Sequence, residues 1–216
     1  MRDAYTDQLD SIRDDLVAMA RLVRTAVDES TAALLEGDPR RAEAVISGDS
    51  RVDALREDVE ARSFELLSLQ NPVAGDLRML VASLRIVGEF ERMGDLAVHV
   101  AKVARLRVPE VAVPPDVMPL ISRMAAIAEV MVGKVEHVIA QSDVAAAMEL
   151  EDLDTEMDQL RRHSFRELLG SDWQHGVESA VDIALLGRYY ERIADHAVSI
   201  ARRVVYLVTG EQPQHV

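Results

Sequence analysis

The chain of 216 residues is long enough to bury a substantial core, and 49% of its residues are hydrophobic but only 4% are aromatic. A core of Ala, Val, Leu, Ile and Met favours helices over a β-sandwich, and the absence of cysteine excludes disulfides, thiolate metal sites and a cysteine nucleophile. The net charge of −14 opposes binding to nucleic acid and to anionic lipid, and it favours metal cations and basic protein surfaces.

Helical periodicity accounts for the first half of the chain. Apolar residues recur at steps of three, four and seven over 5–36, which predicts a helix with one buried stripe. Asp38 and Pro39 then read as an N-cap followed by proline at the first helical position, so a second helix is predicted from there to just before Asn71. A third helix is predicted over 73–107.

A proline-rich stretch follows, and the helical pattern then starts again. The prolines that mark this boundary between the halves are Pro109, Pro114, Pro115 and Pro119. Three further helices are predicted over 116–141, 144–169 and 175–209. Because short connections make sequential helices antiparallel, the sequence predicts an all-α fold of two pseudo-symmetric three-helix bundles, a tandem repeat of six long helices. The expected domains are 1–108 and 116–210, followed by a polar tail, 211–216.

The two halves can be superposed along the sequence. A shift of 105 positions places Asp49 on Asp154 and Asp53 on Asp158, and a shift of 100 places the segment 91–98 on 191–198. The difference between the two shifts falls in the loop between the second and third helices of each half. A change of register confined to a loop is what a duplicated helical unit predicts.

Each half carries two acidic pairs whose members stand four residues apart. Residues at this spacing are neighbours on one helix face, where like charges destabilise by about 0.2–0.5 kcal/mol. In so acidic a chain, chance alone supplies roughly six or seven such pairs, so a single pair indicates only a solvated face. The recurrence of both pairs on corresponding helices of both halves favours a shared function. The eight residues are Asp49, Asp53, Glu91, Asp95, Asp154, Asp158, Glu191 and Asp195.

These carboxylates converge if the second and third helices of each half lie side by side, and such a cluster needs a counter-ion. Oxygen-only ligation suits Mg²⁺, Ca²⁺, Mn²⁺ or iron. Arg92 and Arg192 are competing neutralisers. His99 lies one turn after Asp95 and could add a nitrogen ligand, but Ser199 holds the equivalent position, which favours an ordinary surface histidine.

Signatures of catalysis are missing from the sequence. It contains no glycine-rich phosphate loop, nucleophile elbow or zinc-protease motif, and it lacks the paired Glu-x-x-His of di-iron bundles. We therefore expect no enzymatic activity. Two other interpretations stay open, a metal-storage or metal-dependent hydrolytic bundle and a scaffold whose acidic faces dock basic partner segments.

Three segments, 72–78, 91–97 and 191–197, resemble signatures of the PhoU family of phosphate-signalling regulators, the phosphate-specific transport system accessory proteins. The resemblance covers essentially the whole chain. It implies two three-helix bundles that bind metal ions, sometimes as multinuclear iron or zinc clusters, with manganese or magnesium as other candidates. By match to the family motifs, the ligands are the eight carboxylates named above.

The resemblance also implies a function and partners. Family members are negative regulators of the phosphate-starvation response and of phosphate uptake, and they couple the ATPase subunit of the phosphate ABC transporter to a membrane sensor histidine kinase. No run of about 18 apolar residues predicts a membrane span, and no signal peptide precedes the first helix. We therefore expect a cytoplasmic protein that its partners recruit to the inner membrane face. We expect no nucleic-acid partner, and the sequence is compatible with a homodimer.

Two departures from the family pattern concern the equivalence of the halves. The family commonly has Asn where this chain has His99 and Ser199. The second half also lacks the Pro-x-Ala-x-Asp-Leu-Arg segment and has a different sequence at 171–175. The sequence therefore leaves the equivalence of the two predicted sites open.

Overall fold

A computed structural model describes residues 2–211 of the protein, with side chains from residue 5. The chain is helical throughout this range apart from short connections. Its elements are α1 (Arg2–Glu36), α2 (Pro39–Gly48), α3 (Ser50–Gln70), α4 (Ala74–Arg107), α5 (Met118–Gln141), α6 (Val144–Leu168) and α7 (Gly176–Thr209). The predicted polar tail lies outside the described residues except for Glu211. The all-α prediction is confirmed.

The second predicted helix is a single long helix that is interrupted at Asp49. This residue keeps helical backbone angles, φ −59° and ψ −36°, between the end of α2 and the start of α3. The N–H of Val52 donates to the carbonyl of Asp49 at 2.8 Å, which is the tighter pairing of a 3₁₀ turn. The fold thus has six long helices, and the second of them is irregular at a residue that the sequence marks as a site residue.

Local sequence signals explain where the helices begin. The Asp38 side chain accepts a hydrogen bond from the N–H of Arg40 at 2.8 Å at the start of α2. Asp143, its equivalent in the second half, accepts from the N–H of Ala146 at 3.0 Å at the start of α6. Both aspartates satisfy amides that the first helical turn leaves unpaired.

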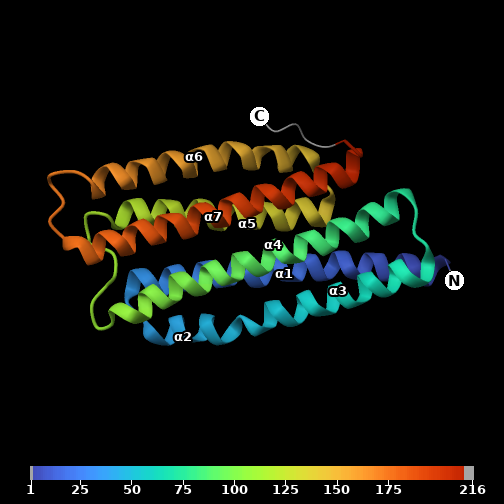
Figure 1. Cartoon of the computed structure of the whole chain (residues 1–216), viewed down its shortest axis with the longest axis horizontal. Coiled ribbons are helices and arrows are strands. Elements are labelled where there is room, and N and C mark those ends of the chain that lie inside the picture. Colours follow the sequence, from blue (N-terminus) through green and yellow to red (C-terminus); the bar gives the residue numbers. More distant parts are fainter. Residues whose placement is uncertain (1, 212–216) are drawn as a thin grey trace.

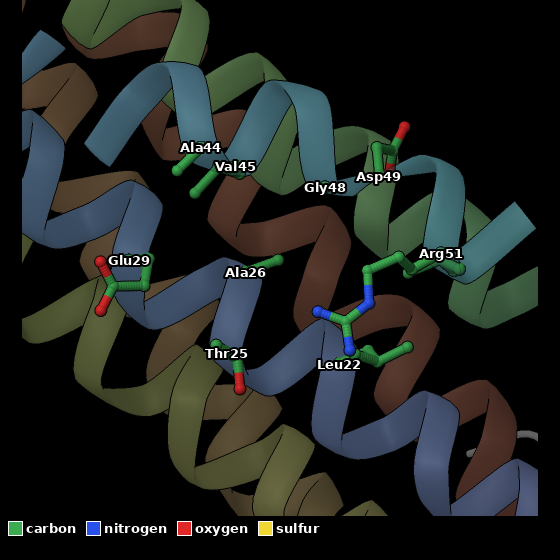
Figure 2. Close-up of a pocket in the computed structure, with 10 residues that line it drawn as sticks. Leu22, Thr25, Ala26, Glu29, Ala44, Val45, Gly48, Asp49 and Arg51 are labelled. Atoms are coloured by element: carbon green, nitrogen blue, oxygen red, sulfur yellow. The ribbon is translucent and has the colours of Figure 1, made fainter. Parts of the chain in front are cut away.

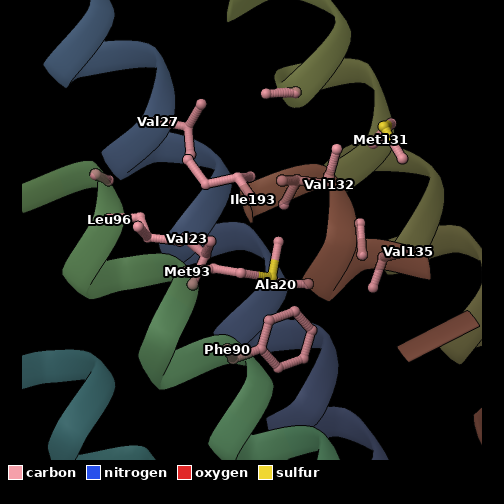
Figure 3. Close-up of a cluster of buried hydrophobic side chains, with 14 of the residues drawn as sticks. Ala20, Val23, Val27, Phe90, Met93, Leu96, Met131, Val132, Val135 and Ile193 are labelled. Carbon is pink, nitrogen blue, oxygen red and sulfur yellow. The ribbon is translucent and has the colours of Figure 1, made fainter. Parts of the chain in front are cut away.

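The two halves share one hydrophobic core. Figure 1 shows α1 and α4 of the first half beside α5 and α7 of the second, with α2 and α3 along one flank and α6 along the other. Figure 3 shows how this junction is filled, with Phe90 and Met93 of α4 close to Ala20 of α1, Val135 of α5 and Ile193 of α7. The exposed faces of α4 and α7 are therefore held in a fixed relation. Within the described residues, no helix has the length and hydropathy needed to cross a membrane.

Candidate metal centres

The irregular turn at Asp49 places its carboxylate directly against α4. A β-carbon built on Gly94 would lie only 3.1 Å from Oδ1 of Asp49. Glycine at this position therefore leaves the space that the carboxylate occupies, on the turn of α4 that carries Glu91 and Asp95.

Electrostatics show that the four predicted carboxylates of the first half are neighbours. Burial raises the pKa of Asp49 above its ordinary value, and the negative charges of Asp95, Asp53 and Glu91 raise it further. Lys102 acts in the opposite direction. A cation at this cluster would relieve the repulsion among its members.

The second half brings its four carboxylates together in the same way. Burial raises the pKa of Asp154 to about 6, with further contributions from Asp195, Asp158 and Glu191. Arg202 partly offsets this effect. Asp154 thus corresponds to Asp49 in its electrostatics as well as in its position in the repeat.

Glu191 makes the second cluster different from the first. Its side chain is buried and accepts a hydrogen bond from Arg161 at 3.0 Å, and Arg188 forms a second ion pair with it. Burial and Asp195 raise the pKa of Glu191, while the two arginines lower it. Glu191 is therefore already paired with two protein side chains.

Glu91, the equivalent residue of the first half, has no such partners in the part of the chain that the structure describes. Gly88 occupies the position that corresponds to Arg188. Arg56, which corresponds to Arg161, pairs instead with Glu60 at 3.2 Å. The oxygens of the first cluster are consequently freer to bind a cation.

Sequence reasoning missed Arg161 and Arg188, although a signal was present. Arg188 precedes Glu191 by three residues, a spacing that brings side chains together on a helix. The predicted neutralisers, Arg92 and Arg192, form no ion pair among residues 2–211. They line a cavity between α4 and α7 together with Glu91, Asp95 and His99.

His99 has an aromatic partner at this cavity. Its ring stacks on that of Tyr189, with ring centroids 5.3 Å apart. The contact joins α4 to α7, so His99 lies beside the first carboxylate cluster while its ring is engaged by the second half.

A separate groove lies on the α1 side of the irregular turn. This cavity of about 330 Å³ is bordered by Asp49 and by mainly small or apolar residues of α1, α2 and α3. In Figure 2, Arg51 extends toward Leu22 of α1, whereas the Asp49 carboxylate points away from α1. Gly48 leaves space here, where the second half has Leu153 packed against the core. The two halves thus differ on both sides of this turn.

The clusters suit a hard cation by their donor chemistry. All eight predicted ligands are carboxylates, which bind Mg²⁺, Mn²⁺ and iron through oxygen. Among residues 2–211, however, no three Asp, Glu or His side chains are arranged to share one ion. Coordination would therefore require rotation of these side chains, which is easier for Glu91 than for the pinned Glu191.

Known proteins resemble the chain over almost all of its length. A family model described as the PhoU domain matches residues 16–104 and 121–204. A Mycobacterium tuberculosis protein, "Phosphate-specific transport system accessory protein PhoU homolog 2", is 42% identical and covers 99% of this chain and 100% of its own. An Aquifex aeolicus homologue of the same accessory protein is 35% identical and covers 96% of this chain and 94% of its own.

The structure agrees with these sequence matches. The crystal structure of PhoU from Pseudomonas aeruginosa superposes with a TM-score of 0.90 at 27% identity, covering 96% of this chain and 100% of that one. The regulatory protein PhoU from Streptococcus pneumoniae shares the fold, with a TM-score of 0.88 at 23% identity and coverage of 98% and 100%. The family match over both halves and the near-complete relatives show that the chain belongs to the PhoU family, which consists of accessory and regulatory proteins and not of enzymes.

Proposed function

We propose that this protein regulates phosphate transport, as a negative regulator of the phosphate-starvation response and of phosphate uptake. Its role would be that of a cytoplasmic adaptor between the ATPase subunit of a phosphate ABC transporter and a membrane sensor histidine kinase. The observation that carries this proposal is the match to relatives named phosphate-specific transport system accessory proteins over 99% of the chain.

The shape of the molecule supports an adaptor role. Its helices form one body with a continuous core, and charged side chains of both halves, among them Arg92 and Arg192, line a cavity between α4 and α7. Such a body can hold two partners in a fixed relation without changing shape.

Deletion of the gene tests the regulatory proposal. We expect phosphate-uptake genes to be expressed at high phosphate in the deletion strain, and the wild-type gene to restore repression. Expression is measured by quantitative transcript analysis at high and low phosphate. Because mycobacteria contain relatives named homolog 1 and homolog 2, the strain must lack every family copy. Unchanged repression in that strain contradicts the proposal.

We further propose that the carboxylate clusters bind metal ions, which would be iron, zinc, manganese or magnesium. In the first half the ligands would be Asp49, Asp53, Glu91 and Asp95. In the second half they would be Asp154, Asp158, Glu191 and Asp195, with Glu191 in competition with its two arginines. The first cluster should therefore bind the ion more tightly.

Titration of chelator-stripped protein with Mn²⁺ in a calorimeter checks the metal sites. Replacement of Glu91 and Asp95 by alanine should weaken the tighter site by more than the roughly 10–100-fold typical of outer-shell changes. The matched control replaces Glu191 and Asp195 and should weaken only the other site.

The pH dependence of Mn²⁺ binding provides a test of the second cluster. Because Asp154 has a pKa of about 6 and must lose its proton to bind a cation, Mn²⁺ affinity at the second site should fall as the pH drops below that value.

The variant with Glu91 and Asp95 replaced by alanine also gives the contradicting outcome. If it binds Mn²⁺ as the wild type does, the proposed metal site of the first half is wrong.

A further inference from the structure

A groove between the start of α4 and the end of α7 combines arginines with exposed apolar side chains. Its cavity of about 230 Å³ is lined by Arg78 and Arg85 of α4 and by Arg203 of α7. Leu77 and Val81, which are 41% and 39% exposed, lie on the same edge of α4. We call this surface the arginine groove.

The positive charge of the arginine groove is largely uncompensated. No Asp or Glu is among its lining residues. Arg78 and Arg85 form no ion pair within the described residues, and the buried Nε of Arg78 has no hydrogen-bond partner. Arg203 is the exception, because it pairs with Glu89 beneath the groove. Most arginines within the described residues pair with acids, and Arg78 and Arg85 belong to the minority that do not.

The internal repeat provides a natural comparison. The shift of 100 residues places Leu77 on Val177 and Val81 on Val181, so the exposed apolar pair is present at the other end of the α4 and α7 helix pair. Position 78, by contrast, is an arginine in the first half and Glu178 in the second.

At that other end, the protein supplies both charges itself. Arg107 at the end of α4 pairs with Glu178 and with Asp182 at the start of α7. At this end of the helix pair, an arginine of α4 is thus joined to carboxylates of α7. At the end that carries the arginine groove, Arg78 and Arg85 have no such carboxylates within the described residues.

We propose that the arginine groove docks an acidic amphipathic helix of a partner protein. Leu77, Val81 and Arg85 succeed one another at steps of four along α4, and a helix laid along them would present apolar side chains at the matching spacing. Its carboxylates would pair with Arg78 and Arg85, as Glu178 pairs with Arg107 at the other end of the α4 and α7 helix pair.

Other occupants fit the arginine groove less well. A free phosphate ion would use the arginines but leave Leu77 and Val81 exposed. An anionic membrane would be repelled by the net charge of −14, and it would not fill a groove between two helices. This inference deepens the proposed adaptor role. It rests on that role only in assigning the partner helix to a protein of phosphate signalling.

Photo-crosslinking in cells tests the proposal. A photoreactive amino acid is placed at Val81 in a strain whose repression depends on this chain, and at the exposed Phe64 of α3 as a control. We expect a crosslink at position 81 to a peptide of another protein that is acidic and amphipathic, and none to that peptide from position 64. The absence of a protein crosslink at position 81, or a crosslink to a second copy of this chain, overturns the proposal.

Charge reversal provides the second arm. Arg78→Glu with Arg85→Glu should lower the yield of that crosslink at least about tenfold, because like charges then oppose each other. Arg40→Glu with Arg166→Glu makes the same change of charge at exposed positions elsewhere and should leave the yield unchanged. An equal crosslink yield in both variants overturns the proposal. Two further measurements compare the variants, which are phosphate binding in a calorimeter and binding to phosphatidylglycerol vesicles. If the groove variant alone loses either kind of binding, the proposal is also overturned.

The two levels of the argument fail separately. If deletion relieves repression but position 81 gives no partner, the adaptor function stands and the arginine groove proposal fails. If the acidic helix is captured and lost on charge reversal while repression persists in the deletion strain, the docking surface stands and the regulatory proposal fails.

Discussion

Replacement of Phe90 by alanine is expected to lower the free energy of unfolding by about 3–5 kcal/mol and to destabilise both halves together. Phe90 is fully buried where α4 meets the helices of the other half, and it is among the largest side chains of the core. Truncation removes its apolar surface from the core and leaves a cavity that tightly packed neighbours cannot fill.

Urea denaturation followed by circular dichroism measures this effect. The control is Phe64→Ala on α3, where the side chain is 61% exposed and the change should stay within about 0.5 kcal/mol. Because the halves share one core, we expect a single transition that moves to lower urea concentration in the Phe90 variant. Two transitions, of which only one moves, would show that the halves unfold independently.

Much of the fold could be predicted from the sequence, because its signals are local. The apolar stripes depend on the period of the helix, and the caps at Asp38 and Asp143 depend on a side chain reaching its own backbone. The same holds for the repeat, since duplicated helices keep their register even where the loop between them changes length.

The candidate site was less predictable, because it depends on packing between distant segments. Asp49 lies against α4 beside Gly94, a contact that no local sequence signal predicts because the two residues are on different long helices. Of the two arginines that pair with Glu191, only one could have been predicted from the sequence. Arg188 lies one turn away, but Arg161 comes from another helix.

Contacts between the halves were beyond sequence reasoning altogether. Glu89 of α4 accepts a hydrogen bond from Nδ1 of His196 at 2.7 Å, and it also pairs with Arg203. Both partners lie on α7, more than a hundred residues away in the chain. No spacing rule connects them, because they meet only when the two halves pack together.

This group of three residues gives the second prediction. Replacement of Glu89 by alanine should lower the free energy of unfolding by about 2–3 kcal/mol at pH 7, since it leaves the buried His196 and the partly buried Arg203 without their hydrogen-bond acceptor. The Glu89 side chain is only 14% exposed, so water cannot replace it freely. Glu151→Ala is the control, because its pair with Arg202 lies at the surface and should contribute at most about 1 kcal/mol.

The effect should also depend on pH in a definite direction. Burial opposes the ionisation of Glu89, but the hydrogen bonds from His196 and Arg203 outweigh it and bring its pKa below the ordinary 4.5. A carboxylate with a lowered pKa contributes stability above its unfolded-state value and loses it as the pH falls through the folded-state value. The difference in unfolding free energy between wild type and Glu89→Ala should therefore shrink as the pH falls below about 4.5. A difference that stays the same down to about pH 3 would mean that Glu89 joins the halves by packing and not by its charge.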